Sequence, residues 1–305
     1  MKKLSILLIG LSLLLTACNL PSMGGAQVYP TLDLTLTALF APTTAPTETP
    51  EPPTVEPSPT VVTPTSPPTE TPVPPTPSVT ATSTALPSRI GPTVYAYFLS
   101  SAPIIDGNWG DWVDRTKQYP ANALVYGRSN WSGGDDLKAS YILGWDYSYF
   151  YIGVKVHDDY YVQNTFGQDL YLSDGVELQL DTNLYGDFYN PVMDVDDFQM
   201  GFSPGYGSVK GEKDAFMWMP RYLAGDKADV IIASQKEDGL YRMEIAIPWG
   251  YFNLTHPYLG MGSGFVLCID DNDDKESSIQ QTMICSDSAR KLLDPTTWGE
   301  VFFVR

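Results

Sequence analysis

Two groups of acidic residues have the composition of a cation-binding loop. Asp194, Asp196 and Asp197 lie within four positions of one another, and positions 270–274 form an unbroken run of four aspartates and one asparagine. Carboxylate and amide oxygens are the ligands that Ca²⁺ prefers, and the ion takes six to eight of them. The run at 270–274 has no glycine at its sixth position and no glutamate at its twelfth, so it is not an EF-hand. Each group is therefore either a calcium loop or solvated surface charge.

Aromatic side chains offer a second kind of chemistry, because a flat ring stacks on the apolar face of a sugar. Trp131 lies in a polar, glycine-rich segment, and Trp218 lies between Met217 and Met219 ahead of a proline. We predict that these two tryptophans are exposed stacking platforms; the alternative is that they cap the ends of the fold. The other five tryptophans lie in apolar patterns and are predicted to be core: Trp109, Trp112, Trp145, Trp249 and Trp298.

The N-terminal segment carries the features of an export signal. Lys2 and Lys3 precede an apolar stretch over 4–15 that is too short to remain as a spanning helix. The sequence Leu-Thr-Ala-Cys that ends at Cys18 resembles the bacterial lipobox, which implies cleavage after residue 17 and lipidation of Cys18. We therefore expect an exported protein, lipid-anchored to the cell membrane, with its folded part outside the cytoplasm. An ordinary signal peptide with a chance cysteine is the alternative.

A tether over 18–41 is followed by a segment that cannot form a core. Residues 42–88 are mostly proline and threonine and contain no glycine, lysine or arginine. Such a composition favours an extended polyproline-II-like chain, which at about 3.1 Å per residue spans on the order of 140 Å. We predict a stalk over 42–90 that lifts a domain away from the membrane; an inert disordered linker would behave similarly.

Composition excludes several classes of function. The formal net charge of -18 argues against nucleic acid as a partner, since phosphate binding needs a basic surface. Neither of the two histidines lies next to a cysteine, which argues against a Cys/His zinc site. We find no serine-nucleophile motif, phosphate loop or dinucleotide fingerprint, and His157 and His256 lack a catalytic context. We therefore predict a protein that is not an enzyme, and we expect it to be a monomer.

Residues 91–305 show the period of two that half-buried β-strands require. Apolar and polar residues alternate over 149–156, 176–181 and 241–247. Further runs with strand character are 137–143, 198–202, 228–234, 264–270, 279–285 and 299–304. With no long helical period, these runs predict an all-β fold, a single antiparallel β-sandwich of jelly-roll type.

The order of several motifs along this region resembles family 9 carbohydrate-binding modules. The motifs are Ile-Asp-Gly-Asn-Trp at 105–109, Trp-Asp at 145–146 before the strand that ends at Asp158, Asp-Gly-Val-Glu-Leu-Gln-Leu-Asp at 174–181, Asp-Asp-Phe-Gln at 196–199, Tyr-Arg-Met-Glu-Ile-Ala-Ile-Pro-Trp at 241–249, and Asp-Pro with Trp-Gly at 294–299. The resemblance implies the sandwich fold and non-catalytic binding of a polysaccharide or oligosaccharide. It also implies structural calcium, which we assign to Asp194, Asp196 and Asp197.

The sugar site of this family clamps a terminal sugar between two tryptophans, and this sequence departs from that pattern. Residues 166–171 lack the first tryptophan, and Cys285 stands at the position of the second. Cys268 and Gly201 replace a glutamine and an arginine of the family, whereas Glu177 persists. We therefore predict a rearranged site whose ligand-binding residues are Trp131, Trp218, Glu177, Gln179, Gln199, Phe166 and Tyr171.

Cys268 and Cys285 are the two thiols that remain once Cys18 is lipidated. They lie on two predicted strands that the aspartate-rich turn joins into a hairpin, and export places them in a compartment that permits disulfides. We predict a disulfide between them, with two buried free thiols as the alternative. Two other functions also stay open: a protein-interaction or adhesion domain that has lost the sugar site, and a haem-binding module using Met200, Met217, Met219 or His157.

Overall fold

The computed structural model describes residues 86–112, 116–237 and 239–305. The predicted signal peptide, Cys18, the tether and most of the predicted stalk therefore lie outside the described residues. No helix among the described residues is long and apolar enough to cross a membrane. The helices that the structure describes are short 3₁₀ turns, as expected from a sequence without a helical period.

Each of the nine predicted strands is present, with bounds shifted by a few residues. The strands and 3₁₀ helices are β1 (Thr93–Phe98), η2 (Trp109–Asp111), β2 (Tyr119–Ala121), β3 (Ala123–Tyr126), β4 (Leu137–Trp145), β5 (Tyr149–Asp158), η3 (Gly167–Leu172), β6 (Gly175–Asp181), β7 (Asp197–Ser203), β8 (Asp214–Met219), η4 (Arg221–Leu223), β9 (Gly225–Asp226), β10 (Ile231–Glu237), β11 (Leu240–Pro248), η5 (Trp249–Phe252), β12 (Gly262–Asp271), β13 (Thr282–Cys285), η6 (Pro295–Thr297) and β14 (Gly299–Val304). The sequence did not predict β1, β2, β3, β8 or β9. Among these, β8 lacks a polar-apolar alternation because both of its faces carry large apolar side chains.

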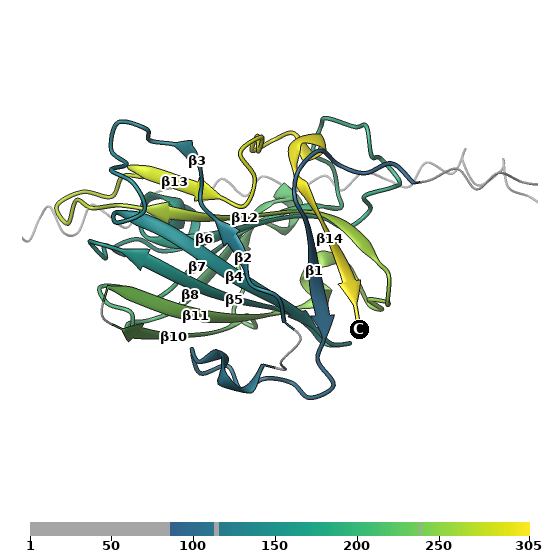
Figure 1. Ribbon diagram of the computed structural model, residues 1–305, viewed down its shortest axis with the longest axis horizontal. Helices are drawn as coiled ribbons and strands as arrows, with labels where there is room; N and C mark the ends of the chain where they lie inside the picture. The colour runs from purple at the N-terminus through teal and green to yellow at the C-terminus, as the bar shows by residue number, and fades with distance from the viewer. Residues whose placement is uncertain (1–85, 113–115, 238) are drawn as a thin grey trace, which may run out of the picture. The chain divides into compact units, whose positions relative to one another are not determined.

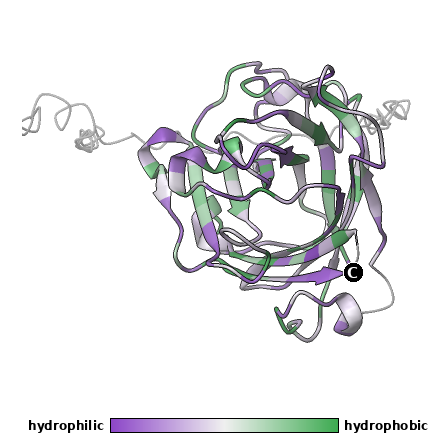
Figure 2. Ribbon diagram, turned by 90° about the vertical axis from the view of Figure 1, so that its left-hand side faces the viewer, coloured by the Kyte–Doolittle hydropathy of each residue, from purple (hydrophilic) through white to green (hydrophobic). Residues whose placement is uncertain are grey.

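The strands form one continuous sheet in the order β10-β11-β5-β4-β1-β14-β12-β6-β7-β8-β9, with β2 beside β4 and β13 beside β12 and β3. Figure 1 shows β12, β6, β7 and β8 side by side, and Figure 2 shows the sheet curling back on itself. The two halves thereby face each other as the two layers of the predicted sandwich. Most pairs are antiparallel, but β1 is parallel to both β14 and β4, because it is the first strand of the domain and no hairpin joins it to either neighbour.

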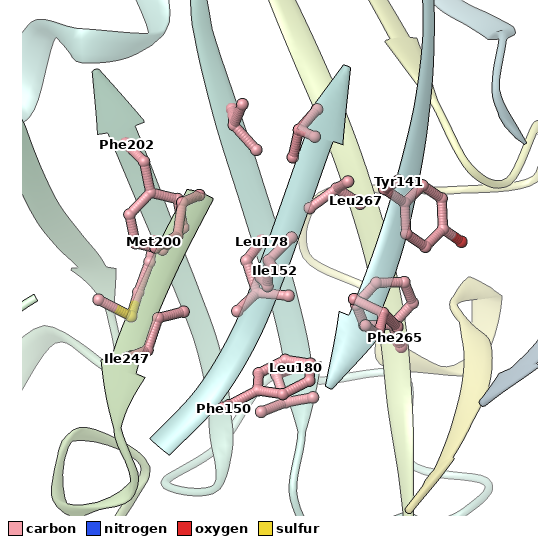
Figure 3. Packing of buried hydrophobic residues seen from close by; sticks show 14 of the residues in the cluster. Tyr141, Phe150, Ile152, Leu178, Leu180, Met200, Phe202, Ile247, Phe265 and Leu267 are labelled. Atoms are coloured by element: carbon pink, nitrogen blue, oxygen red, sulfur yellow. The ribbon is translucent and has the colours of Figure 1, made fainter. Parts of the chain in front are cut away.

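The core fills the space between the two layers. Phe150 and Ile152 on β5 and Leu178 and Leu180 on β6 are fully buried in one cluster, which Figure 3 shows at close range. Because side chains alternate along a strand, the residues between these apolar positions point outward. Glu177 and Gln179 therefore lie on the outer face of β6, and Glu244 lies on the outer face of β11.

The outer face of the β4–β5–β11 layer is covered by the segment around η2. The carboxylate of Glu244 accepts hydrogen bonds from the backbone N–H groups of Asp106 (2.9 Å) and Gly107 (2.7 Å) and from Nε1 of Trp112 (2.6 Å). Trp112 packs there with Leu99 in a second, smaller apolar cluster. The segment over 105–112 and the strand motif at 241–249, which are far apart in the sequence, thus meet and cover this face. Trp112, Trp145, Trp249 and Trp298 are each at most 6% exposed, so the prediction that they are core residues is confirmed, whereas Trp109 is only partly buried.

The domain begins earlier than the predicted boundary at residue 91. Arg89 is 7% exposed, and its guanidinium contacts the carboxylate of Asp181 at 3.3 Å. Its backbone N–H also donates to Glu300 on β14, and the Ser88 hydroxyl donates to the same carboxylate at 3.1 Å. Residues 88–90, assigned to the stalk from their composition, therefore belong to the folded domain.

Candidate functional site

The candidate site lies on the outer face of the β12–β6–β7–β8 layer. Sheet register places Glu177 of β6 beside Gly201 of β7 on one side and Cys268 of β12 on the other. One register step away, Gln179 lies beside Gln199. Buried polar side chains in the middle of a sheet need partners, and those partners define the site.

A cavity of about 390 Å³ opens above these residues. The residues that line it come from β3, η3, β6, β7, β8, β13 and the loops around β13: Val125, Tyr126, Tyr171, Glu177, Gln199, Trp218, Gln280, Met283, Arg290 and Leu292. The structure therefore brings together four of the predicted ligand-binding residues: Tyr171, Glu177, Gln199 and Trp218. The volume of the cavity is that of a small-molecule site, and the cavity wall combines aromatic rings with amide and charged groups.

Trp218 is the aromatic wall of the cavity. Its Nε1 donates a hydrogen bond to the carbonyl oxygen of Gln168 (2.9 Å), and its ring lies edge-on to Tyr171, with centroids 6.3 Å apart. The indole lies over Gly201, where an added Cβ would come within 2.3 Å of Cη2. Glycine at 201 thus makes room for the indole ring.

Glu177 is the polar centre of the cavity floor. It is 3% exposed, and its Oε2 accepts hydrogen bonds from Nε2 of Gln199 (3.2 Å) and from the guanidinium of Arg290 (3.4 Å). Burial raises the pKa of Glu177, and the positive charge of Arg290 and the hydrogen bond from Gln199 offset part of that rise. The result is a desolvated carboxylate that borders open space and is held by two side chains rather than by backbone.

Arg290 and Gln280 are polar residues of the cavity that the sequence analysis did not predict, and Arg290 is the charged one. Its Nε donates to Oε1 of Gln179 at 2.7 Å, and Nε2 of Gln179 donates to the carbonyl oxygen of Leu292 at 2.9 Å. Gln179 is fully buried, so it lies beneath the cavity and positions Arg290 rather than lining the wall. The signal available in the sequence was a lone arginine in the loop that precedes the Asp-Pro motif at 294–295.

The hairpin of β12 and β13 completes the wall. Cys268 and Cys285 lie directly opposite each other and form a disulfide, with Cα atoms 4.0 Å apart. Since Glu177 and Cys268 are register neighbours, the disulfide lies in the strand beside the floor of the cavity. Gln280, in the loop of this hairpin, donates to Oδ1 of buried Asp270 at 2.6 Å.

Comparison with known proteins identifies the architecture. The model of the carbohydrate family 9 binding domain-like family matches residues 105–305. The chain belongs to that family. Two solved structures of a family 9 carbohydrate-binding module from Caldicellulosiruptor kristjanssonii, one in complex with cellotriose and one with glucose, are 21% and 20% identical to it. Each has a TM-score of 0.52 and covers 70% of this chain; the matches extend over 94% and 97% of the modules, respectively.

At these identities, the likeness to the solved modules shows the fold alone. A search of curated proteins gave no match.

Two of the predicted ligand-binding residues of this family 9 domain lie away from the cavity. Trp131 is partly buried against the main core, and its Nε1 donates to the carbonyl oxygen of Leu137 (3.2 Å). The prediction of an exposed platform is therefore wrong for Trp131, which caps the fold instead. Phe166 stacks on Tyr206, with centroids 4.5 Å apart, and is 42% exposed. It does not line the cavity of Trp218.

The predicted metal ligands of the family 9 domain do gather in space. Carboxylate oxygens of Asp194, Asp196 and Asp197 lie within 4.8 Å of one another and of Asp187, which the sequence did not predict. Burial raises the pKa of Asp197 to about 7, and burial together with Asp194 raises that of Asp196 to about 7. Oδ1 of Asp197 is buried and accepts no hydrogen bond from any described residue. An oxygen-only donor set with an unsatisfied buried atom suits a calcium ion.

The acidic run at 270–274 is not simply solvated surface charge, which was one of its two predicted roles. Asp270, Asp271 and Asn272 are each at most 2% exposed. They lie where β12 ends and turns back, so the fold covers them although their composition is polar. The haem alternative loses two of its four candidate ligands, because Met200 and Met217 are fully buried in the apolar core, whereas Met219 and His157 are only partly buried.

Proposed function

We propose that this domain binds a polysaccharide or oligosaccharide, without catalysis, in the cavity of Trp218. The single observation that carries the proposal is the meeting of the Trp218 indole with the buried Glu177–Arg290 pair in one cavity of about 390 Å³. Membership in a carbohydrate-binding family, and the cellotriose and glucose in two modules of similar fold, support the same class of ligand.

Each part of the cavity has a role in this proposal. The apolar face of one sugar ring stacks on Trp218 or Tyr171. The carboxylate of Glu177 accepts hydrogen bonds from sugar hydroxyls, and the amides of Gln199 and Gln280 both donate and accept them. Arg290 also donates hydrogen bonds, and its positive charge favours the ionised form of the buried Glu177 carboxylate. Among the described residues that line the cavity, Glu177 is the one carboxylate, whereas glycosidases generally use a pair, in keeping with a binding role.

The test is calorimetry or affinity electrophoresis of the purified protein against a panel of polysaccharides and their short oligosaccharides. Replacing Trp218 by Ala removes the stacking surface, and we expect the affinity to fall at least tenfold. Phe166→Ala is the matched control, because it removes an exposed aromatic ring outside the cavity and should leave the affinity unchanged. If Phe166→Ala lost binding and Trp218→Ala did not, the glycan site would lie at Phe166 instead. Absence of any glycan ligand would favour the protein-interaction reading instead.

We further propose that Asp187, Asp194, Asp196 and Asp197 hold a structural calcium ion. The support is their grouping within 4.8 Å and the unsatisfied Oδ1 of Asp197. A bound ion stabilises the native state by mass action, about 2.7 kcal/mol at a hundred times its dissociation constant. We expect EDTA to lower the melting temperature of the protein and Ca²⁺ to restore it. If the melting temperature of Asp196→Asn responds less to EDTA and Ca²⁺ than that of the wild-type protein, the ion lies at this group. An unchanged response of the melting temperature would contradict the assignment.

Finally, we propose that the domain is displayed outside the cytoplasm on a lipid anchor at Cys18. The lipobox-like sequence that ends at Cys18 and the proline- and threonine-rich segment after it support this proposal. Labelling with a radioactive fatty acid should mark the wild-type protein in the membrane fraction and fail in Cys18→Ala. A labelled Cys18→Ala protein would place the lipid elsewhere.

A further inference from the structure

The segment around η2 covers only part of the outer face of the β4–β5–β11 layer. Ile142 and Tyr151 belong to the apolar cluster beneath that segment. Further along the described strands β4, β5 and β11, the outward positions include three cations and no carboxylate: Lys138, Ser140, Lys155, His157, Leu240 and Arg242. Residues 86–305 contain 31 aspartates and glutamates against 16 lysines and arginines, so this open half of the face is a local reversal of the charge of the domain.

Sheet register sets the three cations in a row across neighbouring strands. Arg242 lies directly opposite Lys155, and His157 lies opposite Lys138, so Lys138 is a diagonal neighbour of Lys155. Side chains directly opposite each other start about 5 Å apart, and diagonal neighbours start about 7 Å apart. The row therefore presents separate charges to an extended ligand, not one compact site for a single ion.

Lys155 is a cation for which the protein supplies no partner. It is partly buried, and among the described residues its ammonium group has no carboxylate within 4.0 Å and no hydrogen-bond acceptor. Arg242 contacts Glu237 at 2.5 Å and Lys138 contacts Asp135 at 3.8 Å, but the first carboxylate is 43% exposed and the second is fully exposed. Exposed ion pairs contribute little to stability, so the carboxylate of a ligand can replace either acidic side chain.

A cavity of about 330 Å³ lies beside this row of cations. Its wall includes two ammonium groups, two amides and one hydroxyl, from Lys138, Lys155, Gln118, Asn122 and Ser140. Ammonium groups bind carboxylates, while amides and hydroxyls exchange hydrogen bonds with the hydroxyls of a sugar. None of the described residues that line it is a phenylalanine, tyrosine or tryptophan, in contrast to the cavity of Trp218. Together this cavity and the row of cations form the Lys155 groove, where charge takes the place of stacking.

We propose that the Lys155 groove binds an acidic polysaccharide through the carboxylates of its uronic acids, at a second site separate from the cavity of Trp218. Carboxylates match the chemistry of the row, because Arg242 and Lys138 already pair with carboxylates of the protein itself. A linear chain of charged sugars follows the cations from strand to strand while its hydroxyls meet the amides. Membership in a carbohydrate-binding family supports a sugar, not a peptide, as the carrier of these charges.

The charge of the rest of the domain argues against a larger anionic partner. A membrane surface or a nucleic-acid duplex would approach much of the domain at once and meet its excess of carboxylates. A single polysaccharide chain stays within a Debye length, about 8–10 Å, of the cations, and more distant carboxylates are screened from it. Asp158 follows His157 in the sequence but, by the alternation of the strand, extends toward the other face of β5.

The experiment is calorimetry of the purified protein with polygalacturonate, at low and at high ionic strength. Methyl-esterified polygalacturonate is the matched ligand, because it keeps the sugars and lacks the charges. We expect the protein to bind the charged polymer at low ionic strength and to lose most of this binding in concentrated salt, which screens exposed charges. The ester should not bind. Absence of binding to polygalacturonate, or equal affinity for the ester, would overturn the proposal.

Variants place the polymer on the molecule. We expect Lys155→Gln and Arg242→Gln each to weaken binding about threefold, as for partly exposed ion pairs, and the double variant to weaken it about tenfold. Arg221→Gln is the matched control, because it removes an exposed positive charge on η4, next to β8 in the opposite layer, and should leave the affinity unchanged. The melting temperature of the double variant should equal that of the wild type, which separates lost binding from lost folding. Unchanged affinity in the double variant would overturn the proposal.

Two further measurements test the class of ligand and the independence of the site. Binding of polyglutamate, or of vesicles rich in phosphatidylglycerol, as tight as that of polygalacturonate would assign the groove to acidic peptides or to membrane lipid and overturn the assignment to a glycan. Trp218→Ala should keep its affinity for polygalacturonate, so failure of this proposal is distinguishable from failure of the proposed function. Loss of polygalacturonate binding in Trp218→Ala would place the polymer in the other cavity and contradict a second site.

Discussion

Glu244 and Glu177 are buried glutamates on the outer faces of opposite layers of the sandwich, and they have opposite surroundings. Glu244 on β11 is held by two backbone N–H groups and the indole of Trp112, which also covers it. Glu177 on β6 is held by the side chains of Gln199 and Arg290 and borders a cavity. A carboxylate whose donors are fixed and covered stabilises the fold. One whose donors are side chains beside open space is available to a ligand.

The disulfide is the largest expected difference in stability between the two layers, because it lies in the layer of Glu177. Cys268 and Cys285 are 17 positions apart, so their bond stabilises the fold by about 3 kcal/mol in the chain-entropy model. We expect the double replacement by Ser to lower the free energy of unfolding by about that amount, as measured by urea denaturation. Reduction of the wild-type protein should have a similar effect, and equal stability of both forms would contradict the model.

The same substitution at the two glutamates should give opposite results. In Glu244→Gln the new amide nitrogen meets an N–H donor whichever way it is turned, so we expect a loss of about 2 kcal/mol of stability. In Glu177→Gln the two donors meet the same oxygen, Oε2, and the amide nitrogen can take the place of Oε1. We expect little loss of stability there but weaker binding of the glycan. Urea denaturation measures the stability of both variants, and calorimetry measures their affinity for the glycan. If both variants lost the same amount of stability, the contrast between the two glutamates would be wrong.

Gly201 allows a smaller test of the Glu177 face. A Cβ at this position would lie 2.3 Å from Cη2 of Trp218, so Gly201→Ala must displace the indole. Since the indole lies at the edge of the layer, we expect the affinity for the glycan to fall about tenfold, or about 1.4 kcal/mol, with a minor change in melting temperature. Gly250→Ala is the matched control, because no atom lies within 4 Å of its added Cβ.

The smallest expected effect is a pH dependence of glycan binding. Burial raises the pKa of Glu177, so its carboxylate gains a proton at a higher pH than an exposed glutamate, for which the pKa is about 4.3. The protonated form is a poorer acceptor and pairs less well with Arg290. We therefore expect the affinity to be constant at neutral pH and to decline as the pH falls toward the acid range. In Glu177→Gln this decline should be absent, and an identical decline would assign it to another group.

The sequence predicted which side chains face the core of the sandwich better than it predicted the contacts on the outer faces. Alternation over 149–156 and 241–247 specifies which side chains face the core, because one period of two is enough to do so. The sequence analysis also named Glu177 and Gln199 as ligand-binding residues, and both line the cavity. The partners of Glu177 could not be predicted in the same way, since Arg290 reaches it from a loop more than a hundred positions away. Trp131 and Trp218 both stand in segments whose sequence lacks a polar-apolar alternation, and only tertiary contacts decide that one caps the core and the other lines a cavity.

The parallel placement of β1 between β14 and β4 has a mechanical consequence. Arg89 and Ser88 are tied to the domain immediately before this strand, so tension arriving along the chain from its N-terminal side enters the fold here. The register of β1 with β14 runs from Thr93 to Tyr97, and Phe98 is paired with Trp145 of β4. A pull directed along β1 loads these backbone bonds in shear, so they share the force instead of opening one after another like a zip. A domain that binds a polymer while held at its N-terminal end would thus resist a pull through backbone bonds that are loaded together.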